Sequence, residues 1–293
     1  MSDWQKILDT IAEQVRPLSA QGRVATYIPA LSRVPSDHFA MAVATKDGEV
    51  FTAGDADVPF SIQSVSKVFN LVFALDLVGD DLWRRVGREP SGMGFNSLIL
   101  LEVESGVPRN PLINAGAIVT TDAILSHEPN WAEIFLAKMK QLSGSDAVKY
   151  DEEVFQSERE YGDLNRAIAW FLKAKKNLVC DPTATTETYF RTCSTAMSAR
   201  ELAIAGRCLI DESEAADHER LQRVRAIMRT CGLYDAAGDF AFRVGLPAKS
   251  GVGGGILATQ PGEYSVAVWS PALDQKGNSV AGVRALELLT DMV

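Results

Sequence analysis

The sequence contains few histidines and no closely spaced cysteines. They are scattered along its 293 residues, as His38, His127, His218, Cys180, Cys193, Cys208 and Cys231. No HxH, HExxH or CxxC pattern occurs, which argues against a metal-dependent hydrolase, a zinc knuckle and a redox pair. We therefore expect neither a metal nor a cofactor, and we interpret the cysteines as structural thiols in a reducing cytoplasm.

The sequence also lacks a basic excess, a signal peptide and a long hydrophobic run. Its formal net charge of -9 would repel a phosphate backbone or an anionic membrane surface. The opening residues, MSDWQK, lack the basic and then apolar character of a signal peptide. The most apolar stretch, residues 65–78, contains Lys67, Asn70 and Asp76 and is too short to span a bilayer. We expect a cytoplasmic protein that binds no nucleic acid and no membrane.

The pattern of apolar residues predicts an α+β fold. Hydrophobic residues make up 46% of the chain and no Pro- or Ser-rich linker divides it, so we expect residues 1–293 to form a single catalytic domain. Helical spacing predicts a first helix over 4–15, a helix that Gly79 ends, and a last helix around 283–289. Alternation predicts a hairpin of 38–45 with 50–53, and strands at 255–259 and 264–268. An antiparallel sheet from both ends of the chain, flanked by helices, with a helical insertion at about 70–230, fits this order.

Ser64 and Lys67 are the first candidates for chemistry. Residues three apart share a helix face, so the hydroxyl and the ammonium can meet. A lysine whose pKa is lowered by burial can take the serine proton, and a helix N-terminus offers N–H groups to an oxyanion. A surface serine beside a solvated lysine is the ordinary explanation of such a spacing. However, no other serine here has lysine three positions on, and this pair opens the most apolar predicted helix.

A second motif, Lys249-Ser250-Gly251, lies on a predicted late strand. A Lys-Ser/Thr-Gly triplet accompanies SxxK in one class of serine hydrolase, and a backbone N–H there can complete an oxyanion hole. By itself the stretch is equally consistent with a Gly-rich turn. The Ser-x-Asn or Tyr-x-Asn triplet of serine β-lactamases and penicillin-binding proteins is missing from the sequence. That argues against a β-lactamase and leaves the serine–lysine arrangement intact.

In longer blocks the chain resembles the bacterial serine-dependent glutaminases, whose catalytic domain has a β-lactamase/penicillin-binding-protein-like fold. The main blocks are FSIQSVSKVF (60–69), PRNPLINAGA (108–117), CGLYD (231–235), RVGLPAKSGVGGG (243–255) and GNSVAG (277–282). They extend over nearly the whole chain in the family's order. The resemblance implies hydrolysis of L-glutamine to L-glutamate and ammonia through an acyl-serine intermediate, and a homo-oligomer, either dimer or tetramer.

The resemblance also implies roles for individual residues. Ser64 attacks the side-chain amide, Lys67 takes its proton, and Tyr234 relays a proton to the leaving ammonia. The N–H groups of Ser64 and Val252 hold the oxyanion. The residues that bind or line the substrate are Tyr27, Gln63, Asn114, Glu158, Asn165 and Tyr189, together with Ser64, Tyr234 and Val252 themselves. Free glutamine carries an ammonium and a carboxylate, which an acid and several neutral Asn and Tyr donors can hold.

Without the resemblance, these binding residues have ordinary structural explanations. Glu158 lies in the charged run 157–160 and is typical of a solvated face, while the asparagines fit caps or turns and the tyrosines a half-buried core. Two other functions also remain open from the residues alone. One is a β-lactamase, D-peptidase or esterase on the same scaffold, and the other is a non-catalytic module that senses a small amide.

Overall fold

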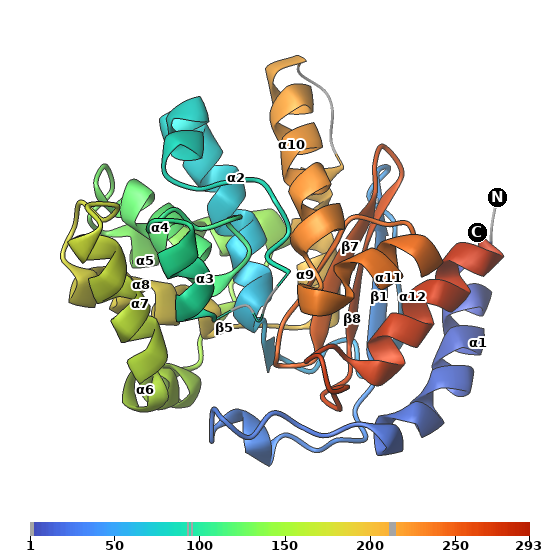
Figure 1. Cartoon of the computed structure of the whole chain (residues 1–293). Coiled ribbons are helices and arrows are strands. Elements are labelled where there is room, and N and C mark those ends of the chain that lie inside the picture. The colour runs from blue at the N-terminus through green and yellow to red at the C-terminus, as the bar shows by residue number, and fades with distance from the viewer. Residues whose placement is uncertain (1–2, 93, 95, 211–214) are drawn as a thin grey trace.

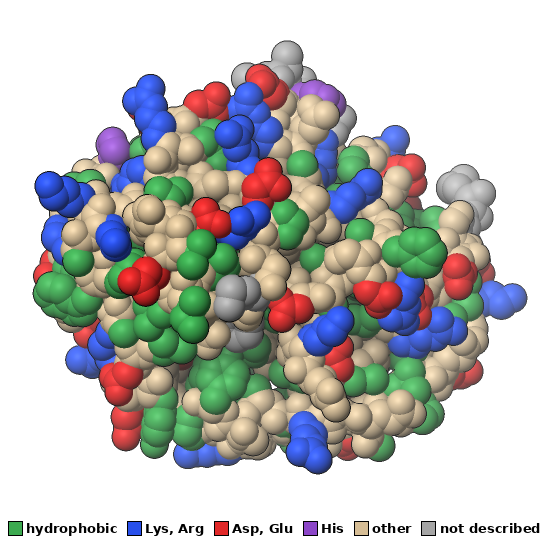
Figure 2. Space-filling model, in the orientation of Figure 1, with side chains coloured by type: hydrophobic (Ala, Val, Ile, Leu, Met, Phe, Trp, Pro, Cys, Tyr) green, Lys and Arg blue, Asp and Glu red, His purple; other side chains and the backbone are tan. Residues whose placement is uncertain are grey.

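The structure is a computed structural model that describes residues 3–92, 94, 96–210 and 215–293, without the side chains of 215–217. A sheet with its covering helices lies on one side of the molecule, and a group of helices lies on the other (Figure 1). Both termini lie on the sheet side. On the face shown in Figure 2, acidic and basic side chains are interspersed, as the mixed charges of the sequence predict.

Five antiparallel strands from both ends of the chain form the larger sheet. Their spatial order is β2 (Val50–Gly54), β1 (Ala40–Thr45), β8 (Tyr264–Trp269), β7 (Gly255–Gln260) and β6 (Ala248–Ser250). β1 and β2 form the predicted hairpin, with Ala44 opposite Val50 and Gly48 at a φ of 94° in the connecting turn. The antiparallel sheet predicted from both chain ends is therefore confirmed.

Helices cover both faces of this sheet. Along β1, Met41 and Val43 belong to the apolar cluster formed with α1 (Trp4–Val15) and α12 (Val280–Met292). The alternate residues Ala40, Ala42 and Ala44 lie in the other cluster, on the face where α9 (Ala199–Gly206) packs. Successive side chains of a strand point to opposite faces, so both sets are buried. The small alanines let α9 approach the sheet closely.

The rest of the chain is mostly helical. The remaining α-helices are α2 (Ser66–Val78), α3 (Leu98–Val103), α4 (Asn114–Leu125), α5 (Trp131–Ser143), α6 (Glu152–Tyr161), α7 (Asp163–Ala174), α8 (Pro182–Cys193), α10 (Ala215–Cys231) and α11 (Ala237–Arg243). The 3-10 helices are η1 (Arg16–Gln21), η2 (Leu31–Arg33), η3 (Gln63–Val65), η4 (Gly79–Arg84), η5 (Arg207–Leu209) and η6 (Tyr234–Ala236). A small second sheet runs in the order β3 (Phe60–Ser61), β5 (Thr195–Met197), β4 (Lys149–Tyr150).

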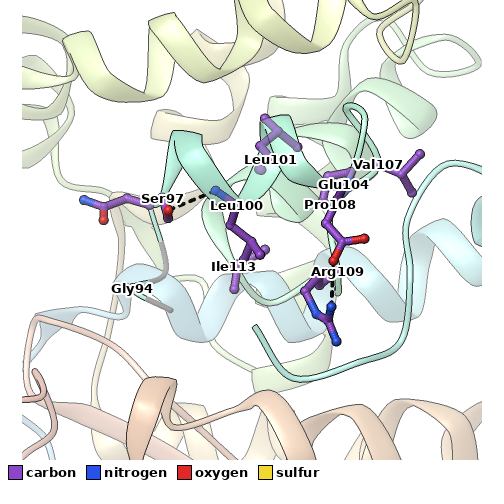
Figure 3. Close-up of a pocket in the computed structure, with 11 residues that line it drawn as sticks. Gly94, Ser97, Leu100, Leu101, Glu104, Val107, Pro108, Arg109 and Ile113 are labelled. Atoms are coloured by element: carbon purple, nitrogen blue, oxygen red, sulfur yellow. Dashed lines mark hydrogen bonds and ion pairs between the residues drawn. The ribbon is translucent and has the colours of Figure 1, made fainter. Parts of the chain in front are cut away.

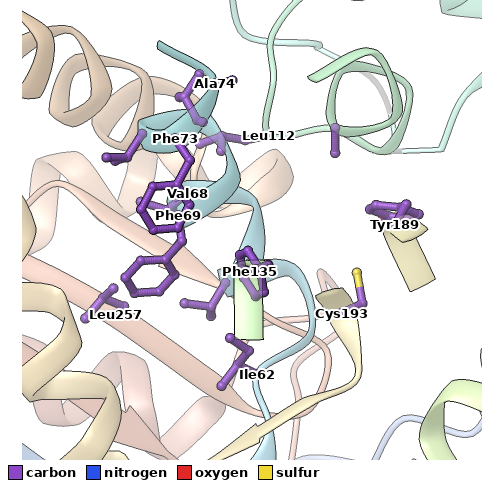
Figure 4. Close-up of a cluster of buried hydrophobic side chains, with 14 of the residues drawn as sticks. Ile62, Val68, Phe69, Phe73, Ala74, Leu112, Phe135, Tyr189, Cys193 and Leu257 are labelled. Carbon is purple, nitrogen blue, oxygen red and sulfur yellow. The ribbon is translucent and has the colours of Figure 1, made fainter. Parts of the chain in front are cut away.

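Helix α2 lies in the centre of the larger apolar core. All its residues from 66 to 75 are buried, and Gly79 ends the helix at a φ of 54°, as predicted. Figure 4 shows Phe69 and Phe73 of α2 in one cluster with Phe135 of α5 and Leu257 of β7. This cluster joins the helices to the sheet, so the segment 64–67, which leads into α2, is fixed against both. Among the described residues, no helix is long and apolar enough to cross a membrane.

Candidate functional site

A pocket of about 340 Å³ opens where η3, α4, α6 and α8 meet. Seven of the ten residues singled out in the sequence line it, namely Tyr27, Gln63, Ser64, Asn114, Glu158, Asn165 and Tyr189. We call it the Ser64 pocket. Tyr27 is 56% exposed and lies at its rim, whereas Tyr189 is buried. The other three predicted residues, Lys67, Tyr234 and Val252, lie behind or beside Ser64, as described below.

Ser64 is held in a strained turn rather than in a regular helix. The sequence predicted Ser64 and Lys67 on one helix, but Ser64 belongs to the 3-10 helix η3 and α2 begins only at Ser66. Gln63 has a φ of 49°, which is a costly conformation for a residue other than glycine. Its side-chain Nε2 donates to the Oγ of Ser61 at 2.9 Å, which holds the turn. Such local strain is a common feature of functional sites.

Lys67 is buried beneath the pocket with neutral partners. Its Nζ lies 2.6 Å from the Oδ1 of Asn114 and 3.5 Å from the carbonyl oxygen of Leu112. Burial disfavours the ammonium and lowers the pKa of Lys67 to about 8, although the negative charge of Glu158 opposes this shift. About a tenth of Lys67 is then unprotonated at pH 7 and able to accept a proton, and the fraction rises with pH.

Tyr234 lies on the other side of Ser64. Its hydroxyl is hydrogen-bonded to Ser64 and donates to the carbonyl oxygen of Ser250 at 3.4 Å. Burial raises the pKa of Tyr234 to about 12, and these hydrogen bonds offset part of that rise. The phenol therefore stays protonated at neutral pH and can donate. The Nζ of Lys249 lies 4.3 Å above the centre of the Tyr234 ring. The lysine of the Lys249-Ser250-Gly251 motif therefore packs against the face of this ring.

The glycine after β6 lets this strand approach Ser64. A Cβ on Gly251 would lie 2.6 Å from the carbonyl oxygen of Ile62 and 3.3 Å from the backbone nitrogen of Ser64. Only glycine fits such a close approach of two backbones. The next residue, Val252, is buried and belongs to the same small apolar cluster as Tyr234. The backbone segments of Ser64 and Val252 therefore lie close together.

The far wall of the pocket carries a buried acid and a chain of amides. Glu158 of α6 is 7% exposed, so the interpretation of its charged run as a solvated face is wrong at this position. Burial raises the pKa of Glu158 to about 7, while a hydrogen bond with Gln63 and the charge of Lys67 oppose the rise. Asn114 donates to the Oδ1 of Asn165 at 2.9 Å and accepts from the hydroxyl of Tyr189 at 3.3 Å. This wall therefore offers one acid, which ionises around pH 7, and several neutral polar groups.

The structure adds lining residues that the sequence analysis missed. These are Ile28, Asn96, Tyr161, Gly162 and Leu164. Tyr161 follows Glu158 by one helical turn, so helix spacing was a signal that could have found it. Asn96 also borders a neighbouring cavity of about 10 Å³, which has room for a single water at most. Figure 3 shows this small cavity between the Ser97 cap of α3 and the ion pair of Glu104 with Arg109.

The described part of the chain offers no obvious metal site. No group of three or more His, Cys, Asp or Glu side chains gathers within the residues that the structure describes. All four cysteines carry free thiols. The arrangement at Ser64 therefore consists of a hydroxyl, a buried amine, a phenol and a polar pocket, which together suit nucleophilic attack on an amide or ester carbonyl.

Residues 22–293 match the family model described as "Glutaminase". The chain belongs to the glutaminase family. It is 52% identical to a glutaminase of Methylobacterium sp. (strain 4-46), over 99% of this chain and 97% of that protein. A probable glutaminase from Bacillus subtilis, complexed with 6-diazo-5-oxo-L-norleucine, superposes with a TM-score of 0.85 at 32% identity, over 97% and 93% of the two chains. The family assignment confirms the resemblance and the amidohydrolase class predicted from sequence.

A further structural relative extends this agreement to the fold. The probable glutaminase ybaS superposes with a TM-score of 0.87 at 38% identity, over 97% of this chain and 96% of that one. The matched length includes both the larger sheet and the helices that form the Ser64 pocket. The α+β architecture described above is therefore that of solved glutaminase structures.

Proposed function

We propose that this chain hydrolyses L-glutamine to L-glutamate and ammonia through an ester on Ser64. The observation that carries the proposal is the position of Ser64 in the wall of a pocket that also carries Glu158, with Tyr234 hydrogen-bonded to it. The buried Lys67, whose pKa is lowered to about 8, follows Ser64 by three residues and contacts Asn114 of the same pocket. The Bacillus subtilis relative is complexed with an analogue named as a derivative of L-norleucine, an α-amino acid. An amino-acid substrate fits a pocket with one acid and several neutral donors.

In the first half-reaction the unprotonated Lys67 accepts the proton of Ser64, whose oxygen attacks the side-chain amide carbon of glutamine. The N–H groups of Ser64 and Val252 stabilise the oxyanion. Tyr234 donates a proton to the nitrogen as the carbon–nitrogen bond breaks, and ammonia leaves. Tyr234 is suited to this step because its hydroxyl remains protonated and contacts Ser64.

In the second half-reaction water replaces ammonia. The first half-reaction leaves one proton on Lys67 and none on the Tyr234 oxygen, and this proton can pass between the two groups. Whichever of them is unprotonated takes the proton of the attacking water, the ester bond to Ser64 breaks, the other returns its proton to the Ser64 oxygen, and glutamate leaves the pocket. Throughout, Glu158 pairs with the substrate ammonium, while Asn114, Asn165 and Tyr189 hold its carboxylate and Tyr27 and Gln63 close the pocket around it. Such a clamp rejects compounds that lack either charged group.

We also propose a fold relationship, an oligomeric state and a cellular compartment for this chain. Three features support a β-lactamase-like fold: the antiparallel sheet, the SxxK serine in the turn before a buried helix, and the KSG strand beside it. We propose a single domain with the helical insertion at about 70–230. The family resemblance supports a homo-oligomer, to be checked by light scattering. The four free thiols fit a reducing cytoplasm.

The decisive experiment compares the protein with its Ser64→Ala variant. Ammonia release is measured from glutamine and from asparagine, and ring opening is measured with a chromogenic β-lactam. We expect turnover of glutamine that Ser64→Ala abolishes. Ser66→Ala is the matched control, because Ser66 is a buried serine two residues on that does not line the pocket. Glutamine turnover that survives Ser64→Ala, or binding of glutamine without turnover, would refute the proposal.

A further inference from the structure

The turn that carries Val252 joins β6 to β7 beside Ser64. The backbone nitrogen of Gly254 donates to the carbonyl oxygen of Gly251 at 2.9 Å, so Val252 and Gly253 are the two central residues of a β-turn. Within the part of the chain that the structure describes, the N–H of Val252 donates to no protein acceptor. In the proposed reaction this N–H meets the oxyanion. Its direction therefore depends on what holds the turn.

Backbone contacts with the segment before Ser64 hold the turn only in part. A Cβ on Gly253 would lie 2.4 Å from the carbonyl oxygen of Ser61, so the two backbones touch. This contact limits how far the turn can move toward Ser64. It does not fix the tilt of the turn, because Gly253 and Gly254 can adopt a wide range of backbone angles, and Gly254 has a φ of 92°.

Trp269 anchors the same turn with a side-chain hydrogen bond. Its indole Nε1–H donates to the carbonyl oxygen of Gly253 at 3.0 Å. Trp269 ends β8 directly opposite Gly255, the first residue of β7, so the pairing of these strands places the indole next to the turn. The anchored carbonyl lies in the peptide between Gly253 and Gly254. Fixing it restricts rotation at the two residues that are otherwise the most mobile in the turn.

The indole is itself held in place by aromatic packing. Trp269 is 1% exposed, and the ring of Phe60 stacks on it with centroids 4.9 Å apart and planes within 3°. The ring of His38 also stacks on it, with centroids 4.9 Å apart. Phe60 belongs to β3, which leads into the turn of Ser64. One rigid ring therefore contacts both segments that supply the proposed oxyanion hole, those of Ser64 and Val252.

We propose that Trp269 is a positioning residue for the oxyanion hole, an inference that rests on the proposed function. Through Gly253, its indole N–H keeps the N–H of Val252 directed at the oxygen of the substrate carbonyl. Trp269 is not among the described residues that line the Ser64 pocket. Its effect falls on the transition state, because negative charge on that oxygen develops only there and a preorganised donor stabilises it.

Exchanging the indole nitrogen alone tests this proposal. Trp269→3-benzothienylalanine, introduced by amber suppression, replaces the N–H with sulfur and keeps the stacked bicyclic ring. Trp269→Phe also removes the N–H but leaves a cavity in the core. Trp131 offers the matched control, because it is 2% exposed and its Nε1 donates to the Oδ1 of Asn70 at 2.8 Å. Trp131→3-benzothienylalanine loses a buried hydrogen bond of the same kind, in the helical core.

The measurements are kcat and KM for glutamine and the inhibition constants of two ligands. One ligand is glutamate, and the other is an analogue with a boronic acid in place of the side-chain amide. The Ser64 oxygen adds to boron, its proton passes to Lys67, and the tetrahedral boronate places a hydroxyl at the oxyanion position.

We expect Trp269→3-benzothienylalanine to lower kcat about tenfold, a part of the roughly 10² to 10³-fold that loss of a whole oxyanion donor costs. The boronate should bind more weakly by a similar factor. KM and the inhibition constant of glutamate should be unchanged, because neither ground-state complex carries the oxyanion. In the Trp131 variant all four constants should stay at their wild-type values.

Either of two results would overturn the inference and leave the proposed function standing. One is a wild-type kcat in Trp269→3-benzothienylalanine. The other is a loss of kcat that is matched in the Trp131 variant or accompanied by equally weak binding of glutamate, since both would show a general loosening of the fold. A wild type that does not hydrolyse glutamine would overturn both proposals together.

Discussion

The Nζ of Lys67 lies 2.6 Å from the Oδ1 of Asn114, which is a neutral amide oxygen. A neutral acceptor orients the amine without stabilising its charge as much as a carboxylate would. The amide NH2 of Asn114 donates to Asn165 at 2.9 Å, which fixes the oxygen toward Lys67. Burial can therefore keep the pKa of Lys67 at about 8 while the amine stays in place.

Replacing this amide with a carboxylate should move the pH dependence of the reaction. Asn114→Asp puts a negative charge beside the Nζ of Lys67, which favours the ammonium and raises its pKa. Because the unprotonated amine is the proposed base, kcat rises as pH passes through that pKa. We expect the rising limb, near pH 8 in the wild type, to move up by about 1–2 units. The measurement is kcat for glutamine between about pH 6 and 10.

Asn165→Asp is the matched control for this change. It introduces the same charge one hydrogen bond further from Lys67, so the rising limb of the kcat–pH profile should move less. A limb that keeps its position in Asn114→Asp would show that the titration belongs to a group other than Lys67.

Glu158 should make the folded protein less stable as pH rises. Its pKa is raised from 4.5 to about 7 by burial, so the folded state binds this proton more tightly than the unfolded state. The contribution of Glu158 to stability is full below pH 4.5 and is lost as pH rises to about 7. The glutamine of Glu158→Gln cannot ionise, so the variant does not lose this stability as pH rises. We therefore expect the variant to have a higher Tm than the wild type above pH 7 but not at pH 4, measured by scanning calorimetry.

The same variant should bind glutamine poorly, since its amide cannot neutralise the substrate ammonium. KM should rise by about 10-fold or more. Glu160→Gln, an exposed neighbour on the same helix, should change neither Tm nor KM. A Glu158→Gln protein with an unaltered KM would remove Glu158 from the binding site.

Much of the fold was predictable because its elements have clear periodicity. The alternation of Met41 and Val43 predicts the first strand, and helical spacing predicts α1 with the observed bounds. The small sheet of β3, β5 and β4 was missed because strands of two or three residues show no alternation. The 3-10 turn at Ser64 was also missed, because the sequence does not report the positive φ of Gln63.

The residues of the site likewise fall into those with a local sequence signal and those without one. Ser64 and Lys67 have a local signal, a spacing at the head of an apolar helix, and family blocks support the remaining residues. Glu158 has no local signal, because its neighbours Arg159 and Glu160 are exposed and its burial comes from tertiary packing, including that of α6 against α8.

Removing one oxygen from Tyr234 should slow the chemistry and spare binding. Tyr234→Phe deletes the hydroxyl that is hydrogen-bonded to Ser64, and the ring can still pack over Lys249. Loss of a positioned acid typically lowers kcat by about 10² to 10⁴-fold. KM should change little, because Tyr234 does not line the Ser64 pocket. Steady-state kinetics with glutamine separate the two constants.

Tyr161→Phe is the control, since Tyr161 lines the pocket but is 57% exposed. Its kcat should remain near that of the wild type. If Tyr234→Phe kept full kcat, the proton of the leaving group would have to come from another residue, and Lys67 would be the first candidate.

Two glycines near the site should respond oppositely to the same substitution. A Cβ on Gly232 would lie 1.7 Å from the carbonyl oxygen of Ala248, so Gly232→Ala forces the end of α10 away from β6. We expect a loss of about 3 kcal/mol or more in the free energy of unfolding, from overpacking against rigid backbone. Gly238→Ala meets no atom within 4 Å and should gain about 0.5–1 kcal/mol, because it lowers the entropy of the unfolded chain.

Urea denaturation gives both free energies from the midpoint and slope of each transition. Gly232→Ala should also lower kcat, because Tyr234 follows two residues later and its hydroxyl contacts the strand that would be displaced. Gly238→Ala should keep the wild-type kcat. Equal stability of the two variants would contradict the close packing of α10 on β6, and with it the placement of Tyr234 against Ser64.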